Sequence, residues 1–222
     1  MKLRKSENIF VLGIFLAVTG LISATALAVV SNRTSPAIAA AKARQTATAL
    51  KRLGLPEFNN DPTTNTGVFK ACDGSEVSFL GAKMNGKITG IAGRTSVNGY
   101  AGAIKVMAGL DTDGNILAVI VEEHKETPGL GAGVCDRKFQ RSIHQLTNPE
   151  PDKLPANPIL DQFHGLRAVP GKRWAVKADG GDFQYRTGAT VTSRAVTTAV
   201  DRIASLYCQK RQEIIAKLSE QK

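Results

Sequence analysis

The sequence predicts an α+β protein, with an N-terminal transmembrane helix followed by an extracytoplasmic domain whose antiparallel sheet is flanked by helices. Three observations support this class. An uncharged apolar run extends from Ile9 to Val30. Two turn dipeptides, Asn85-Gly86 and Asp113-Gly114, lie between β-prone segments. Apolar residues then recur every three or four positions from Ser193 to Leu218, which is the period of an amphipathic helix.

The N-terminal run, residues 9–30, predicts a membrane anchor. As a helix it would be about 33 Å long, enough to cross the hydrocarbon core of a bilayer. Lys2, Arg4 and Lys5 precede it, so residues 1–8 are expected in the cytoplasm and the rest outside, with a single pass through the cell inner membrane. A cleaved signal peptide is the alternative, because Ala26-Leu27-Ala28 has the small-x-small form of a cleavage site. The length of the run favours the anchor, and both interpretations imply export.

Charge and cysteine usage exclude several function classes. The net charge is +10, from 29 basic and 19 acidic residues, but the basic residues are scattered, so no nucleic-acid partner is expected. Cys72, Cys135 and Cys208 are far apart and form no C-x-x-C motif, which argues against a zinc knuckle or a thioredoxin-like pair. One extracellular disulfide remains an alternative, but we expect each cysteine to be buried and inert.

Residues 31–66 are predicted to form a juxtamembrane helix and a linker. Ser35 suits a helix cap and Pro36 a first helical position. Alanine, lysine and arginine then favour a helix to about Leu53, which Gly54 and the following proline would end.

Residues 67–205 are predicted to form the folded domain, and residues 206–222 the end of its last helix. Asn-Gly and Asp-Gly favour two-residue hairpin turns, because both central residues tolerate positive φ. The other expected elements, in chain order, are a buried strand at 116–121, a break at 125–134, a short helix at 137–146, a proline-rich loop at 148–158, a last strand and turn within 173–183, and the helix from Ser193 to Leu218.

The segment GGDFQYRTGATVTSRAV, residues 180–196, stands at the predicted strand-to-helix junction. Free backbone N–H groups at a helix start attract anions, and the helix dipole adds to this effect. Gly188 and Ala189 would let a ligand approach the backbone, and Thr190 and Thr192 offer hydroxyls. These features favour a bound phosphate. The alternative is a threonine or serine cap on the helix.

This segment resembles the covalent FMN-attachment signature, Ser/Thr-Gly-Ala-Thr, of bacterial FMN-binding domains. A second block, GYAGAIKVMAGLDTDGNILAVIVEEHKETPGLG at residues 99–131, resembles the other recognisable part of these domains. Together the two blocks are most similar to the G subunit of the Rnf electron-transport complex. The C subunit of the Na⁺-translocating NADH:quinone reductase is the nearest relative and an alternative assignment.

The resemblance implies that Thr190 is esterified to the phosphate of FMN by a separate flavin transferase. It also implies a surrounding cofactor site, with Glu126 fixing one loop. The other implied site residues are Thr187, Gly188, Ala189, Val191, Thr192, Thr127, Leu130 and Gly131. Members of the family usually have an acidic residue six positions before the attached threonine; this sequence has Gln184 there, with Asp182 nearby.

The implied function is a membrane-anchored flavoprotein that relays electrons within an ion-translocating ferredoxin:NAD oxidoreductase, alongside other membrane subunits. A cofactor-free scaffold is the alternative. A free-standing exported flavin enzyme is disfavoured, because no residues remain for an additional substrate domain. The histidines, His124, His144 and His164, show no metal-site spacing. Trp174 is expected in the core, whereas Tyr185 could equally stack on a flavin.

Overall fold

The computed structural model describes residues 9–137 and 154–220. The chain divides into two compact units, Met1–Gln45 and Thr46–Lys222. Helix α1 (Ile9–Arg52) runs from the first unit into the second. The two units are described separately below.

The described part of the first unit, residues 9–45, is helical. Within α1, the segment Phe10–Ile38 is 29 residues long and apolar enough to cross a membrane, which confirms the predicted N-terminal apolar helix. Three hydroxyls inside it bond to carbonyls one turn earlier: Thr19 to Phe15 at 2.9 Å, Thr25 to Leu21 at 2.7 Å and Thr34 to Val30 at 2.9 Å. Polar groups in lipid must be satisfied within the protein, and these bonds meet that requirement.

The prediction of a new helix start at Ser35 and Pro36 was wrong. Helix α1 continues through Pro36 without a break. A proline inside a helix removes one backbone hydrogen bond and costs about 3 kcal/mol relative to alanine. The alanines that follow Pro36 are strong helix formers, and their helix propensity helps to explain why α1 continues past the proline.

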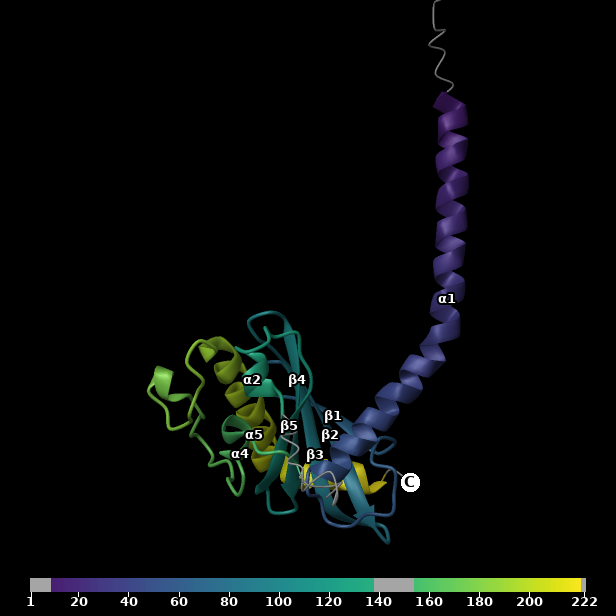
Figure 1. Ribbon diagram of the computed structural model, residues 1–222. Coiled ribbons are helices and arrows are strands. Elements are labelled where there is room, and N and C mark those ends of the chain that lie inside the picture. Colours follow the sequence, from purple (N-terminus) through teal and green to yellow (C-terminus); the bar gives the residue numbers. More distant parts are fainter. Residues whose placement is uncertain (1–8, 138–153, 221–222) are drawn as a thin grey trace, which may run out of the picture. The chain divides into compact units, whose positions relative to one another are not determined.

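The second unit contains the predicted antiparallel sheet. Its strands are β1 (Thr66–Lys70), β2 (Glu76–Met84), β3 (Lys87–Asn98), β4 (Ala103–Asp111) and β5 (Ile116–Glu123). They form one five-stranded meander in the order β1-β2-β3-β4-β5, so every neighbour in the sheet is also a neighbour in the chain (Figure 1).

The two predicted hairpin turns differ in their outcome. Asn85 and Gly86 have φ values of 52° and 80°, as a tight two-residue turn requires. The β4–β5 turn is longer. A two-residue turn of the same type needs positive φ at both Asp113 and Gly114, and only Gly114 has it, at 92°. The Asp111 carboxylate accepts the backbone N–H groups of Asp113 at 2.9 Å and Asn115 at 2.8 Å. These bonds stabilise a longer turn, so the two-residue prediction was wrong at this position.

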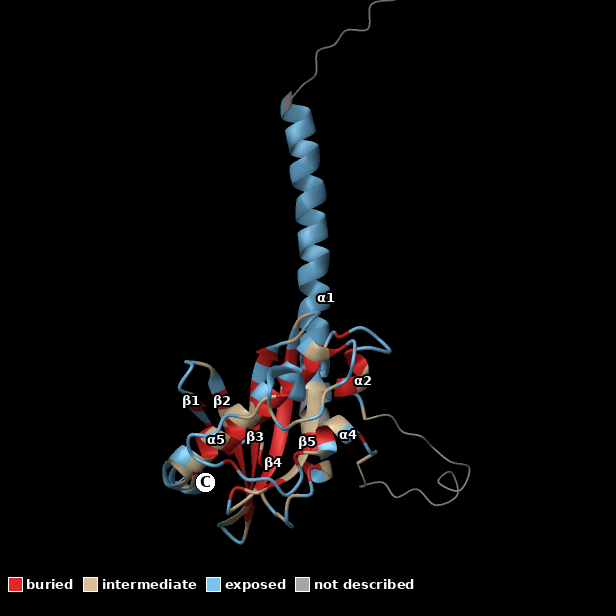
Figure 2. Ribbon diagram, turned by 90° about the vertical axis from the view of Figure 1, so that its left-hand side faces the viewer, coloured by how far each residue is buried: buried red, intermediate tan, exposed pale blue. Residues whose placement is uncertain are grey.

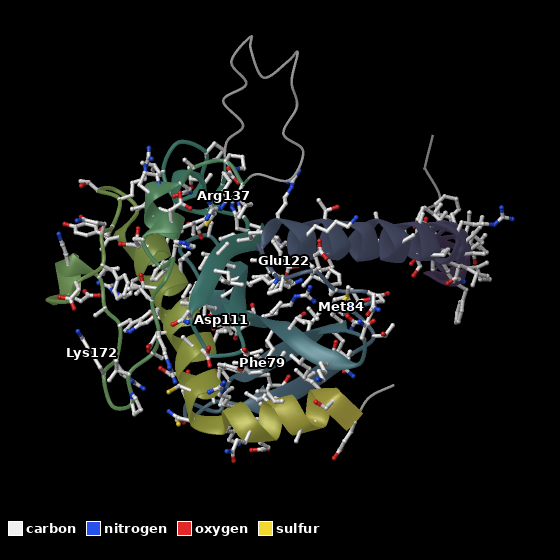
Figure 3. All side chains as sticks on the ribbon, turned by 90° about the horizontal axis from the view of Figure 1, so that it is seen from below. Phe79, Met84, Asp111, Glu122, Arg137 and Lys172 are labelled. Atoms are coloured by element: carbon white, nitrogen blue, oxygen red, sulfur yellow. The ribbon has the colours of Figure 1, made fainter. Side chains whose placement is uncertain are left out.

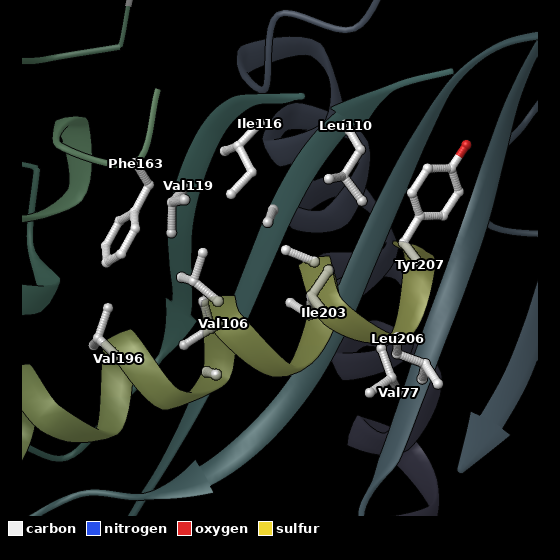
Figure 4. Close-up of a cluster of buried hydrophobic side chains, with 14 of the residues drawn as sticks. Val77, Val106, Leu110, Ile116, Val119, Phe163, Val196, Ile203, Leu206 and Tyr207 are labelled. Atoms are coloured by element: carbon white, nitrogen blue, oxygen red, sulfur yellow. The ribbon is translucent and has the colours of Figure 1, made fainter. Parts of the chain in front are cut away.

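Helices cover both faces of the sheet, and the inner strands β2, β3 and β4 are more buried than the edge strands β1 and β5 (Figure 2). Helix α5 (Thr190–Glu220) packs its apolar side onto one face, where Val106, Leu110, Ile203 and Tyr207 share a core (Figure 4). The described part of the expected C-terminal segment, residues 206–220, belongs to this packing, since Ile214 and Leu218 are fully buried.

The end of α1 packs onto the opposite face, where Leu50 and Leu53 contact Leu80 and Met107. A polar contact accompanies this packing: Arg94 Nη2 donates to Glu122 Oε1 at 2.9 Å and to Thr46 Oγ1 at 3.2 Å. Burial raises the pKa of the Glu122 carboxyl, although Arg94 opposes the shift.

Of the described residues between the sheet and α5, three short stretches are helical: α2 (Ala132–Cys135), α4 (Pro158–Asp161) and the 3₁₀ turn η1 (Lys177–Asp179). Of the predicted helix 137–146, only Arg137 lies within the described residues. Its buried guanidinium donates to the Val119 carbonyl at 2.9 Å and to Asp161 Oδ1 at 2.6 Å, and so holds α4 against β5 (Figure 3).

The predicted last strand within 173–183 was wrong. A single bridge joins Val176 to Phe183, and η1 lies between them. The rings of Phe163, Trp174 and Phe183 pack together with centroids 5.0–5.9 Å apart. Packing among these three rings, and not the hydrogen bonds of a strand, therefore fixes this segment. Trp174 has the packing role that the sequence predicted. Helix α5 begins at Thr190, three residues before the predicted start.

Candidate functional site

A tight turn leads into the N-terminus of α5. The backbone N–H of Ala189 donates to the Arg186 carbonyl at 2.9 Å, and Gly188 has φ of 81°. Ser193 secures the turn from inside the helix: its hydroxyl accepts the Arg186 N–H at 3.1 Å and donates to the Ala189 carbonyl at 3.0 Å. The left-handed conformation explains the glycine at position 188.

The threonines of this turn have unused hydroxyls. Thr187 is exposed and Thr190 is half-buried. Within residues 9–137 and 154–220, neither hydroxyl has a hydrogen-bond partner. Thr190 is also the first residue of α5, where backbone N–H groups lack helical partners and the helix dipole is positive. An available hydroxyl and a field that favours anions therefore coincide at Thr190.

A buried carboxylate links this helix start to two other segments. The Glu126 side chain is only 5% exposed. Its Oε1 accepts the N–H of Ala101, in the β3–β4 hairpin, at 3.0 Å. Its Oε2 accepts the hydroxyl of the buried Thr192, in the first turn of α5, at 2.6 Å. Glu126 thus joins the hairpin, its own loop and α5 around one side chain.

Two glycines make room for this carboxylate. A Cβ atom at Gly131 would clash with Glu126 Oε2 and would lie 2.7 Å from Thr192 Oγ1. A Cβ atom at Gly99 would clash with Glu126 Oε1. Any side chain at either position would therefore separate the three segments that Glu126 joins.

The loop that follows Glu126 lies against the turn before α5. Leu130 Cδ2 is 3.4 Å from the position of a Cβ atom on Gly188, and Arg186 Nη2 donates to the Gly129 carbonyl at 3.1 Å. Thr127 and Leu130 are exposed, whereas Gly131 is buried. The structure therefore brings the two sequence blocks together, 126–131 beside 187–192, with Ala189 buried and Val191 exposed at the contact.

Two arginine side chains lie near this turn in the sequence. Arg186 is adjacent to it, and Arg194 lies one helical turn beyond Thr190. Arg194 forms a two-bond pair with Asp179, with both distances 2.6 Å, and these bonds lower the pKa of the Asp179 carboxyl. Asp182 is exposed and pairs with Lys172 at 3.1 Å.

The remaining candidates have structural roles. His124 Nε2 lies 2.8 Å from Asp136 Oδ1, and its Nδ1 accepts the Glu126 N–H at 3.2 Å. His164 Nδ1 lies 2.6 Å from the Leu117 carbonyl, while His144 lies outside the described residues. No group of three metal-ligating side chains occurs among the described residues.

The cysteines only partly follow the prediction. Cys135 is buried, and burial together with the charges of Glu126 and Asp136 raises the pKa of its thiol to about 12. Cys72 is exposed, so the prediction of burial was wrong there; it lies in the turn between β1 and β2.

Sequence reasoning missed the β3–β4 hairpin as part of the site. Asn98 and Val191 line one groove of about 350 Å³ between the end of β3 and α5. Tyr100, at the hairpin tip, is 76% exposed. The available signal was Asn98-Gly99-Tyr100, a turn dipeptide followed by an aromatic residue, but its partner Glu126 is distant in the chain.

Comparison with known proteins identifies the family. A family model described as the FMN-binding domain matches residues 99–205. The G subunit of the ion-translocating oxidoreductase complex of Cereibacter sphaeroides (strain ATCC 17023) is 32% identical over 210 residues, covering 93% of this chain and 87% of that protein. The chain belongs to this G-subunit family. The corresponding protein of Photorhabdus laumondii is 32% identical over 211 residues, 93% of each chain.

Other members of the G-subunit family match a shorter part. That of Escherichia coli K12 is 40% identical over 129 residues, 58% of this chain and 54% of the relative. The FMN-binding domain match includes the tip of the β3–β4 hairpin from Gly99 onward, the 126–131 loop and the turn at Thr190. The predicted resemblance to the G subunit is therefore confirmed, and FMN is the cofactor of the matching domain.

Proposed function

We propose that this member of the G-subunit family is a membrane-anchored flavoprotein of an Rnf-type ion-translocating oxidoreductase, carrying FMN as a phosphoester on Thr190. The observation that carries the proposal is the hydroxyl of Thr190, which has no partner among the described residues and stands at the start of α5 within an FMN-binding domain. The ester would join Thr190 Oγ to the flavin phosphate with the net loss of one water, which takes the hydroxyl proton of Thr190, and a separate flavin transferase would form it.

The residues around Thr190 suit a phosphate. The first-turn N–H groups of α5 and the nearby cations Arg186 and Arg194 would stabilise its negative charge. Gly188 leaves the approach free of a side chain. Glu126 and Thr192 would hold the 126–131 loop, including Thr127 and Leu130, beside the cofactor.

Bound FMN supplies one- and two-electron chemistry, and the protein orients it and adjusts its potential. With residues 1–8 in the cytoplasm, the domain would lie outside, where free flavin is dilute. A non-covalent cofactor would then be lost by mass action, and an ester prevents that loss. A single helix cannot carry electrons through a bilayer, so integral-membrane subunits would supply the remaining redox centres. Electron exchange between ferredoxin and NAD, coupled to ion movement, would follow from that assembly.

The test is the intact mass of the full-length protein isolated from cells with an active flavin transferase. Wild type and Thr190→Ser should carry one FMN less one water, and Thr190→Ala should carry none. Thr198→Ala is the matched control, because Thr198 is an exposed threonine of the same helix and lies outside the attachment signature; it should remain modified.

An unmodified wild-type protein would contradict the attachment and favour the cofactor-free scaffold. Gln184→Glu would then show whether the missing carboxylate is the reason, since it restores the acidic residue usual in the family. Modification that persists in Thr190→Ala but disappears in Thr187→Ala would move the ester to the other threonine.

A further inference from the structure

Tyr100 is an aromatic side chain with no packing role in the fold. Tyr100 is 76% exposed, although it lies in a hairpin turn closed by a 2.8 Å bond from the Gly99 N–H to the Gly102 carbonyl. No ring of the described residues pairs with it, in contrast to Trp174, which packs between Phe163 and Phe183. Burying an aromatic ring is strongly favourable, so an exposed aromatic side chain on a hydrogen-bonded turn is a candidate contact for a ligand.

The hairpin tip is tied to the first turn of α5 through Glu126. Both neighbours of Tyr100 contact the Glu126 carboxylate: Ala101 through its N–H, and Gly99 through close packing. The other oxygen of that carboxylate bonds Thr192 Oγ1 at 2.6 Å. One carboxylate therefore spans the whole gap between the tip and the first turn of α5. The groove shared by Asn98 and Val191 lies at the same junction.

Two further apolar side chains are exposed here. Leu130 is 49% exposed and contacts the turn at Gly188, while Val191 is 43% exposed directly after Thr190. Tyr100 is the third exposed side chain of this set, so each of the three segments that meet at Glu126 carries one. Outside the apolar helix α1, exposed large apolar side chains are few among the described residues, so this grouping is informative.

We propose that Tyr100 stacks on the isoalloxazine ring of the flavin held on Thr190, with Leu130 and Val191 completing the contact. This inference rests on the proposed function and adds a positioning residue to it. A flexible ribityl chain alone would leave the ring free to move, whereas an aromatic contact selects one position. The structure favours Tyr100 over Tyr185, which is half-buried and lines a different groove of about 390 Å³ with Gly129, Pro158 and Ile159.

The test uses full-length flavinylated protein and reads the flavin itself. Intact mass first establishes the flavin content of each variant, and fluorescence is then expressed per bound flavin. A phenol ring in contact quenches flavin emission, whereas phenylalanine stacks without quenching. Tyr100→Phe should therefore increase the fluorescence per bound flavin, while the fluorescence anisotropy of the flavin stays high. Tyr100→Leu should brighten it and lower the anisotropy, since the ratio of stacked to free ring should fall roughly two- to tenfold.

Tyr185→Leu is the matched control and should change neither signal. Unfolding wild type in urea should brighten its flavin as Tyr100→Leu does. The proposal is overturned if Tyr100→Leu and wild type have equal fluorescence and anisotropy, or if only Tyr185→Leu brightens. A wild-type protein without flavin would overturn the attachment itself, and the mass measurement separates that result from a failure of stacking alone.

Discussion

At the residue scale, Glu126 organises the site. A buried carboxylate is tolerated when hydrogen bonds replace its hydration, and here a backbone N–H and a threonine hydroxyl do so. The sequence indicated Glu126 through the Glu-Thr-Pro-Gly-Leu-Gly segment. It could not identify Ala101 as a partner, because contacts between residues far apart in the chain depend on the tertiary fold and leave no local pattern.

The bond between Thr192 and Glu126 predicts a measurable contribution to stability. Thr192→Val keeps the volume but leaves Glu126 Oε2 buried without a donor, so the free energy of unfolding should fall by about 1–3 kcal/mol. Thr198→Val is the control: Thr198 is exposed on the same helix, and its change should remain within about 0.5 kcal/mol. Urea unfolding of both variants measures the difference, and equal values would show that the buried bond contributes nothing.

At the element scale, the two hairpin turns show what a dipeptide can and cannot predict. Asn85-Gly86 forms the expected tight turn, and the bond from the Asn85 N–H to Asn59 Oδ1 at 3.3 Å leaves that turn at two residues. At Asp113-Gly114, the Asp111 carboxylate accepts the backbone N–H groups of Asp113 and Asn115, and these bonds stabilise a longer turn. The predicted strand near Trp174 failed for a related reason, since three aromatic rings pack more favourably than an isolated strand would. Apolar periodicity predicted α5, turn dipeptides between β-prone segments predicted the sheet, and bonds and packing by particular side chains determined the connections.

The packing of α5 on β3 predicts a coupled pair. A Cβ atom at Gly93 would clash with Ile203 Cγ2 and would lie 3.1 Å from the Phe79 ring. Gly93→Ala should therefore destabilise the fold by about 1–3 kcal/mol through overpacking. Ile203→Ala should cost about 2–5 kcal/mol by leaving a cavity. The double variant should be less destabilised than the sum, because the added methyl group fills part of that cavity. Additive values from urea unfolding would mean that the helix moves away from the strand.

At the scale of the whole molecule, the remaining question is the side of the membrane on which the domain lies. The basic residues Lys2, Arg4 and Lys5 predict a cytoplasmic N-terminus and an external domain. The three cysteines provide a reporter, because Cys72 is exposed, Cys208 is half-buried and Cys135 is buried, with a thiol pKa raised to about 12. The thiolate is the form of cysteine that reacts with maleimides, so Cys135 should not be labelled in the folded protein.

A membrane-impermeant maleimide should therefore label Cys72 in Cys208→Ser protein while the inner membrane is intact. Cys72→Ser in the same background should abolish the signal, since only the buried Cys135 remains. Unfolding in denaturant should then expose Cys135 and restore labelling, which shows that the reagent and the protein are both present. Labelling of Cys72 that appears only after the inner membrane is permeabilised would place the domain in the cytoplasm, and the argument from diluted external flavin would no longer explain an ester at Thr190.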